Sequence, residues 1–167
     1  PALDARHAAL LPAEGLERYR PTEAQWQGLR SMRGMQRFYR LKGWSAAPHI
    51  YAAPDGIWLF TPLRDVGVHA GTGNGSRKAG WYSIGLEMVG DFDKQLPAGA
   101  VWDNALAVIG GLAQVLGIAP RKLISFHRDY TDKKSCPGWA VTKDWVFGEV
   151  EAWLASRTPP PPPPPGP

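Results

Sequence analysis

Residues 83–89 read SIGLEMV, and their pattern is typical of a β-strand with one face buried. The apolar side chains fall on every second residue: Ile84, Leu86 and Met88. Glu87 interrupts this strand with a carboxylate, and burying an isolated charge is costly. We therefore expect Glu87 either to lie at a rim, paired with Lys or Arg, or to act as a general base.

Further strand signals lie on both sides of this stretch. HIYAA (49–53) and IWLFT (57–61) flank a Pro-Asp-Gly turn, a pattern that predicts a β-hairpin. Leu123 to Phe126 form a short apolar run that predicts another strand, leading directly into His127. The sheet is therefore expected to assemble from segments that lie far apart in the sequence.

Three helices are predicted around these strands. A Thr-x-x-Gln capping box at residues 22–25 precedes an apolar stripe from Trp26 to Phe38. A second stripe runs from Trp102 to Leu116 and is closed by Gly117, and a third spans Trp145 to Leu154. Strands interleaved with helices indicate an α/β fold, a single domain with a mixed central β-sheet and helices packed on it.

Length and composition are those of a folded protein with one domain. The chain has 167 residues, of which 44% are hydrophobic and 20% charged, values that exclude a wholly disordered chain. Residues 159–165 are seven consecutive prolines, which favour an extended polyproline II tail. We expect a globular domain over residues 1–157 and a proline-rich tail over 158–167. A spacer role for this tail is favoured over a docking ligand for an aromatic groove.

Charge favours one class of binding partner, and the rest of the composition excludes several features. Nineteen Lys and Arg against 15 Asp and Glu give a formal charge of +4 and a pI near 9.4, which favours anionic partners. The basic residues do not cluster with aromatic residues in a nucleic-acid-binding module, so no nucleic-acid partner is expected. No apolar run approaches the roughly 20 residues of a membrane span. The single cysteine, Cys136, excludes an internal disulfide.

Residues 126–139, FHRDYTDKKSCPGW, combine side chains suited to metal chemistry. His127 follows the predicted strand, and Cys136 lies nine residues later, before a Pro-Gly turn. Imidazole and thiolate are good zinc ligands, although a free cysteine is often only a small buried hydrophobe. Lys134 would place an ammonium beside such an ion, where it could stabilise an oxyanion. The His-Arg-Asp triplet at 127–129 matches a kinase catalytic loop by coincidence, because no Asn follows at the required offset.

Four motifs occur in an order that resembles a known enzyme family. They are GVHAGTGN (67–74), SIGLEMVGDF (83–92), GIAP (117–120) and FHRDY…KKSCPG (126–138). GWSAAPHIYAAPDGIW (43–58) extends the likeness upstream. The chain resembles the type-2 N-acetylmuramoyl-L-alanine amidases, the zinc amidase family that also includes peptidoglycan recognition proteins and phage lysozyme-amidases.

This resemblance implies both a fold and a reaction. It implies a mixed sheet with packed helices and a shallow groove that takes the glycan-peptide strand of peptidoglycan. The implied reaction is hydrolysis of the amide between N-acetylmuramic acid and L-alanine, with Zn²⁺ as the cofactor. By motif position, His127 and Cys136 resemble two of the three zinc ligands. Lys134 resembles the lysine that stabilises the tetrahedral intermediate.

The resemblance also implies roles for residues upstream. Glu87 lies where one branch of the family keeps its catalytic carboxylate. Another branch uses a Tyr at the position that is Pro48 here, so Glu87 is expected to carry the catalytic role. His69 and Asn74 resemble groove residues that contact substrate, and His49 is expected to line the same cleft.

The first zinc ligand of the family is a His near the end of the first strand, usually within a His-His-Thr-Ala-like motif that is absent here. One placement uses His7, because HAALLPAEG (7–15) resembles the His-x-x-x-Leu-Pro-Pro stretch of the cytosolic recycling branch. The other placement counts back from Trp26, which puts the ligand position on Leu16 or Glu17 and removes the first ligand. We favour His7 as this first ligand, which would complete a set of three with His127 and Cys136.

Two functions from different classes follow. The first is a zinc amidase in which Glu87 takes the proton of the attacking water and passes it to the leaving amine, while Lys134 and zinc stabilise the oxyanion. The second is a non-catalytic peptidoglycan-binding or particle-assembly component, tethered by the proline tail. The sequence assigns no localisation, and the resemblance fits a phage lysis protein (an endolysin), a phage particle, or a periplasmic or extracellular enzyme acting on the cell wall.

Overall fold

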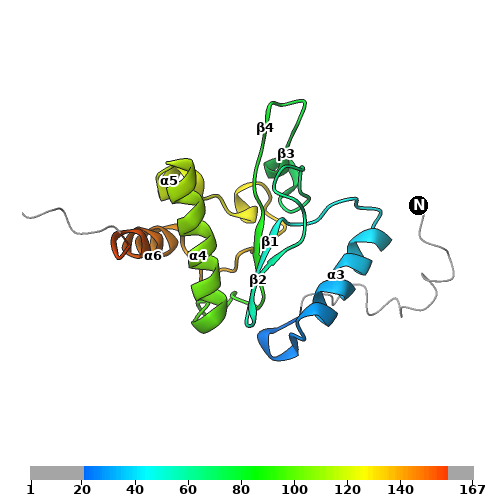
Figure 1. The fold of residues 1–167 in the computed structure, drawn as a ribbon, viewed down its shortest axis with the longest axis horizontal. Helices are drawn as coiled ribbons and strands as arrows, with labels where there is room; N and C mark the ends of the chain where they lie inside the picture. The colour runs from blue at the N-terminus through cyan, green and yellow to red at the C-terminus, as the bar shows by residue number, and fades with distance from the viewer. Residues whose placement is uncertain (1–20, 158–167) are drawn as a thin grey trace, which may run out of the picture.

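Residues 21–157 are described by a computed structural model of the chain, shown in Figure 1. The α-helices are α3 (Leu29–Leu41), α4 (Gly99–Leu116), α5 (Pro120–Leu123) and α6 (Lys143–Ala155). The strands are β1 (Ile50–Ala53), β2 (Gly56–Leu59), β3 (Gly75–Ser76), β4 (Trp81–Tyr82) and β5 (Leu86–Met88). Three short 3₁₀ helices complete the order: η1 (Glu23–Gln25), η2 (Gly71–Asn74) and η3 (His127–Asp129).

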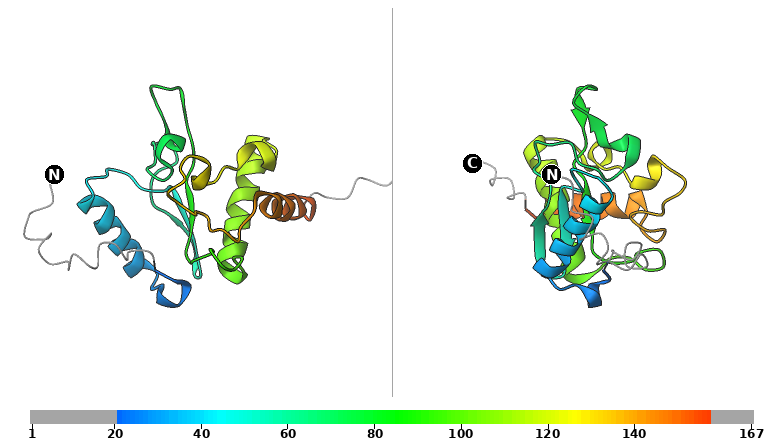
Figure 2. Two further views of the ribbon diagram at one scale, coloured as in Figure 1. Left: turned by 180° about the vertical axis from the view of Figure 1, so that it is seen from behind. Right: turned by 90° about the vertical axis from the view of Figure 1, so that its right-hand side faces the viewer.

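A mixed sheet of three strands lies at the centre, in the order β2-β1-β5. β1 pairs antiparallel with β2 through the predicted hairpin and parallel with β5, so that Tyr51 is opposite Glu87. α3 covers one face of this sheet, α4 covers the other, and α6 packs on the outer side of α4 (Figures 1 and 2). The separate β3–β4 hairpin projects from one end of the molecule (Figure 1). These layers confirm the α/β fold with a mixed central sheet.

Two hydrophobic clusters hold the layers together, because successive side chains of β1 point to opposite faces. Tyr51 packs with Met32 and Met35 of α3. On the other face, Ala52 packs among the apolar residues of α4 and α6. Its small side chain lets α4 approach closely, and the Asn104 side chain donates a hydrogen bond to the Ala53 carbonyl (2.9 Å).

The predicted helices form, with one difference at the first. α4 ends where predicted, with Gly117 in the left-handed conformation (φ 64°), and α6 covers the third stripe. The first predicted helix forms as two separate helices, η1 and α3, because Gly28 between them has a φ of 53° and cannot continue a helix. The capping residues Thr22 and Gln25 therefore cap η1 instead of the long helix.

The strand predicted over Leu123 to Phe126 is wrong in the described structure. Leu123 ends α5, and the residues that follow are extended but pair with no strand within 21–157. Phe126 is buried in the core beside α4 and α6, with Ile124 packed against the same cluster. The apolar pattern therefore reflects burial of side chains and not a ladder of backbone hydrogen bonds.

Two further expectations concern the ends of the chain and the membrane. His7, Leu16, Glu17 and the tail over 158–167 lie outside the described residues. Within the described part, one helix, α4, is long and apolar enough by composition to span a membrane. That test is weak here, because α4 contributes Val101, Trp102 and Ala105 to the hydrophobic core.

Candidate functional site

The loop that follows the extended segment is organised by Arg128. Its guanidinium donates hydrogen bonds to the carbonyls of Ser135 (3.0 Å), Gly138 (2.6 Å) and Val141 (2.5 Å). Its backbone N–H donates to the Cys136 carbonyl (3.2 Å). One residue thus joins the chain beside His127 to the chain around Cys136.

Neighbouring groups hold this arginine in place. The guanidinium lies over the rings of Phe126 (4.8 Å) and Trp139 (5.5 Å), a favourable cation–π geometry. Asp129 accepts hydrogen bonds from the Phe126 N–H (2.8 Å) and the Lys143 ammonium (2.7 Å). Desolvation alone would raise the pKa of Asp129, but these two bonds, together with the charges of Lys143 and Arg128, outweigh it and leave the pKa below its usual value. The turn is therefore anchored on both sides of His127.

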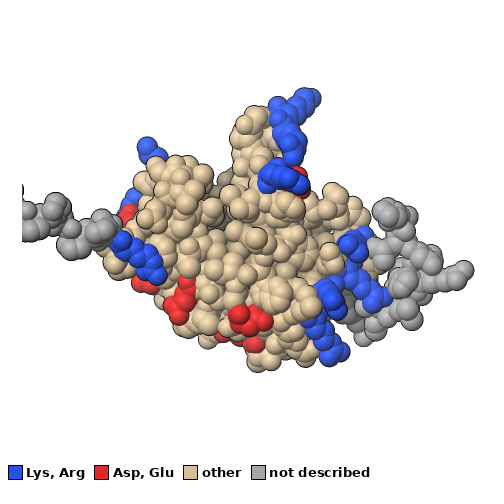
Figure 3. Space-filling view, in the orientation of Figure 1, with Lys and Arg blue, Asp and Glu red and all other residues tan. Residues whose placement is uncertain are grey.

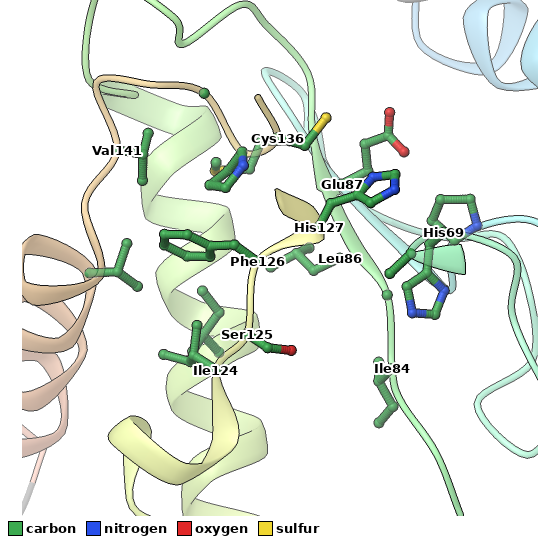
Figure 4. A pocket seen from close by; sticks show the side chains of 18 of the residues that line it. His69, Ile84, Leu86, Glu87, Ile124, Ser125, Phe126, His127, Cys136 and Val141 are labelled. Atoms are coloured by element: carbon green, nitrogen blue, oxygen red, sulfur yellow. The ribbon is translucent and has the colours of Figure 1, made fainter. Parts of the chain in front are cut away.

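A cavity of about 780 Å³ lies between β5, α4, the extended segment and this loop. Apolar side chains such as Leu86 and Ile124 line much of it. Figure 4 shows the Cys136 sulfur, the His127 ring and the Glu87 carboxylate at one end of it. The structure therefore brings together three predicted site residues from two distant segments.

His69 lines the same cavity, beside β5. Its Nε2 is 2.9 Å from the Ser83 hydroxyl oxygen, and that hydroxyl donates to the Gly73 carbonyl (2.5 Å). Since the only hydroxyl proton is used, His69 must carry its own proton on Nε2. Burial, then the nearby His49 and His127, lower the pKa of His69 to about 4, so the ring is neutral at pH 7.

Asn74 supports the backbone beside His69. Its side-chain oxygen accepts hydrogen bonds from the N–H groups of His69 (2.9 Å) and Ala70 (2.6 Å). The 3₁₀ turn η2 carries Asn74 back toward His69, which makes these two short contacts possible. Asn74 therefore fixes the turn, and its predicted contact with substrate stays a prediction.

His49 is completely buried, with a relative exposure of 0%. Its Nδ1 accepts a hydrogen bond from the Gly85 N–H (2.9 Å), and its Nε2–H donates to the Asp65 carbonyl (2.9 Å). Both ring nitrogens are thus used inside the protein. Its predicted role in the substrate cleft stays a prediction. In this geometry the side chain acts as a structural pin, meaning that it joins the backbone at Gly85 to the backbone at Asp65.

Lys134 lies on the Arg128-anchored loop, two residues before Cys136, and is exposed to solvent. No ion pair of Lys134 occurs within residues 21–157. Lys134 thus lies on the same loop as Cys136, as its predicted role requires. That role, stabilisation of the oxyanion, stays a prediction.

A comparison with protein-family models decides the family. The model described as N-acetylmuramoyl-L-alanine amidase matches residues 13–139. The chain belongs to this amidase family. The match includes Glu87, His127, Lys134 and Cys136, and it begins after His7. Comparisons with curated proteins and with solved structures found no match.

The amidase family is usually zinc-dependent, and the side chains of this site can be compared with the ligands that zinc prefers. Within residues 21–157, no group of three His, Cys, Asp or Glu side chains could hold a metal. His127 and Cys136 supply two donors of the type that zinc prefers, on a loop that Arg128 holds against the His127 turn. The described residues therefore fit two of the three protein ligands of a catalytic zinc site.

Sequence reasoning missed Arg128 and Ser83, the residues that hold the site in shape. The His-Arg-Asp triplet was dismissed, yet its arginine supports the loop between the two donors. An arginine next to a candidate ligand in a loop closed by Pro-Gly is a signal of such support. Ser83 carried no signal, because its partner His69 is 14 residues away in the sequence.

Proposed function

We propose that this chain is a zinc-dependent N-acetylmuramoyl-L-alanine amidase. It hydrolyses the amide between the lactyl group of N-acetylmuramic acid and L-alanine in peptidoglycan. Membership of the amidase family supports peptidoglycan amidase activity in general. The observation that carries the finer proposal is the meeting of His127, Cys136 and Glu87 at one end of a large cavity.

His127 and Cys136 would hold the zinc ion, and His7 is proposed as the third protein ligand. When bound, zinc acidifies water and polarises a carbonyl, which is the chemistry that amide hydrolysis needs. Arg128 keeps the His127 turn and the Cys136 loop at a constant separation through its three carbonyl contacts. The two donors are thus held ready before any metal binds, which lowers the entropy cost of binding.

Glu87 is proposed as the general base and then the general acid. It is half-buried on β5, in a strand that pairing with β1 holds rigid. Its carboxylate takes a proton from the attacking water and returns it to the leaving amine of L-alanine. Lys134 donates a hydrogen bond to the oxyanion that develops on the scissile carbonyl.

His69 is proposed to face the substrate as a neutral ring. Ser83 and Asn74 hold it from two sides, one at the ring and one at the backbone. With a pKa of about 4, it is not a cation at neutral pH. It therefore contributes hydrogen bonding and shape, and not charge, to a glycan-peptide strand.

The test is release of new amino termini and muramoyl ends from purified sacculi. Wild-type protein with zinc is expected to release both, and Glu87→Gln is expected to lose about 10²-fold or more of the rate. Glu151→Gln is the matched control, because Glu151 is an exposed carboxylate on α6 that pairs with Arg121 of α5. Equal rates for Glu87→Gln and wild type would overturn the assignment of Glu87.

A second candidate is a non-catalytic peptidoglycan-binding protein. It is supported by the finding that residues 21–157 hold only two of the three zinc donors. It predicts saturable binding to sacculi with no new amino termini, even after zinc is added. Zinc content per chain, measured for wild type and His7→Ala, separates the two candidates. One zinc that is lost in the variant supports the enzyme.

A further inference from the structure

α3 carries an unusual concentration of positive charge. Four of its 13 residues are arginines and none is acidic: Arg30, Arg33, Arg37 and Arg40. Lys42 follows directly after the helix. This single segment carries more positive charge than the formal +4 of the whole chain, so the remaining residues are close to neutral.

The four arginines lie along one side of the helix. Their spacing of three, four and three residues places them within an arc of about 80°, over a length of about 15 Å. Met32 and Met35 point to the opposite side, where they are buried against Tyr51 of the sheet. The arginine stripe therefore lies on the side of α3 that faces away from the sheet. Figure 3 shows basic side chains gathered over α3.

Several basic side chains elsewhere in the fold are paired with carboxylates, whereas three arginines of the stripe are paired with no carboxylate of residues 21–157. Arg77, Arg121 and Lys143 each pair with a carboxylate. Within residues 21–157, Arg30, Arg33 and Arg40 form no ion pair, and all three are exposed. No carboxylate of the described residues therefore neutralises these three charges.

We infer that the arginine stripe of α3 is a binding surface for a phosphodiester-linked polyanion attached to the cell wall. Arginine in place of lysine favours this chemistry, because its planar fork binds phosphate oxygens in pairs. The three exposed guanidiniums of Arg30, Arg33 and Arg40, spread over about 15 Å, match a linear polymer with repeated charges better than a single small anion. The choice of a wall polymer rests on the proposed function, which places the protein at peptidoglycan.

A membrane is the less favoured partner. An amphipathic helix that inserts into a lipid surface needs an exposed apolar face. In α3 that face is already covered, since Met32 and Met35 are 6% and 3% exposed. One large apolar residue of α3, Leu29, is 51% exposed, and a single side chain does not form an apolar face that could insert into lipid.

The test compares two triple variants with the same loss of charge. Arg30→Gln/Arg33→Gln/Arg40→Gln removes the exposed part of the stripe, while Arg64→Gln/Lys78→Gln/Lys94→Gln removes three exposed cations elsewhere. The probe is soluble poly(glycerol phosphate), with binding measured between 50 and roughly 300 mM salt. The stripe variant is expected to bind roughly tenfold more weakly or worse, with a salt dependence lower by about two to three units in the log–log slope. The control variant is expected to bind like wild type.

Equal losses in both variants would overturn the inference, because net charge alone would then explain binding. Stronger binding of wild type to anionic lipid vesicles or to single-stranded DNA than to the phosphodiester polymer would also overturn it. Amidase release from sacculi stripped of phosphodiester polymer is measured in parallel. Equal release by wild type and the stripe variant on these sacculi, with a defect only on untreated sacculi, supports the inference. Wild type and both variants could all fail to release amino termini while the stripe variant still loses polymer binding. That result would overturn the proposed enzymatic function and would support the binding surface.

Discussion

His49 and Gly85 are joined by two hydrogen bonds, one through the imidazole and one through the backbone. The Gly85 N–H donates to His49 Nδ1 (2.9 Å), and the His49 N–H donates to the Gly85 carbonyl (3.0 Å). Because His49 directly precedes β1 and Gly85 directly precedes β5, this pair sets how the two strands align. The alignment in turn places Glu87 opposite Tyr51. A buried residue with no exposed atom thus positions the proposed catalytic carboxylate.

Replacing His49 by Ala is expected to destabilise the fold by about 2–4 kcal/mol. The change leaves a cavity and strips a partner from the buried Gly85 N–H. Urea unfolding measures the loss, with His49→Asn as a variant that keeps a polar side chain. A loss below about 0.5 kcal/mol for the Ala variant would contradict the role of His49 as a pin.

Replacing Gly85 by Ala is expected to displace His69. An added Cβ would lie far inside contact distance of His69 Cγ, and Ser83 holds His69 at the other edge of its ring. We expect a loss of about 1–3 kcal/mol in unfolding free energy. Gly111→Ala is the control, because nothing lies within 4 Å of its added Cβ. That change should stabilise α4 by up to about 1 kcal/mol, and an equal effect at both positions would refute the close contact.

Replacing Arg128 by Lys is expected to loosen the loop that carries Cys136. A lysine keeps the charge but cannot donate to three carbonyls at once, and unmet partly buried carbonyls cost about 2–4 kcal/mol in sum. Unfolding measures stability, and cobalt binding followed by the thiolate absorption band reports on His127 and Cys136 directly. Arg121→Lys is the control, since its pairs are exposed and worth about 0–1 kcal/mol. Unchanged cobalt spectra and affinity for Arg128→Lys would show that the loop does not need the three hydrogen bonds of the Arg128 guanidinium.

Acid is expected to destabilise the protein through His69 between about pH 6.5 and pH 4. The folded-state pKa of about 4 lies below the unfolded value of 6.5, so the unfolded chain binds the extra proton in this range. The contribution of His69 is fully present above pH 6.5 and is lost as the pH falls through 4. After allowance for partial exposure it amounts to about 1–2 kcal/mol. Unfolding at pH 7.0, 5.5 and 4.5 should show a smaller acid loss in His69→Gln, and parallel losses in both proteins would argue against the shift.

Replacing Lys134 by Gln is expected to lower kcat by about 10²–10³-fold with little change in KM, because the lysine acts on charge that exists only in the transition state. Lys133→Gln is a matched control on the adjacent residue, which is also exposed. Hydrolysis of a soluble muramoyl-peptide gives both constants. A rise in KM at constant kcat would assign Lys134 to substrate binding instead.

The sequence by itself determined the elements whose signals are local and the family to which the chain belongs. The apolar stripe closed by Gly117 became α4, and the Pro-Asp-Gly turn produced the β1–β2 hairpin, because helical periodicity and turn chemistry depend on residues only a few positions apart. The motif order around Glu87 and His127 was sufficient for the amidase family.

Only the tertiary structure decided which groups those residues meet. The apolar run at 123–126 has the same pattern whether it pairs in a sheet or fills a core, and long-range packing made it the latter. The same holds for the buried pairing of His49 with Gly85 across 36 residues, and for the carbonyls that Arg128 collects from its loop. Hydrogen-bond partners distant in sequence leave no periodic trace, since any donor can meet any acceptor that the fold brings near. Composition and local pattern therefore named the chemical groups of this site, and the packing of the sheet against its helices assigned their partners.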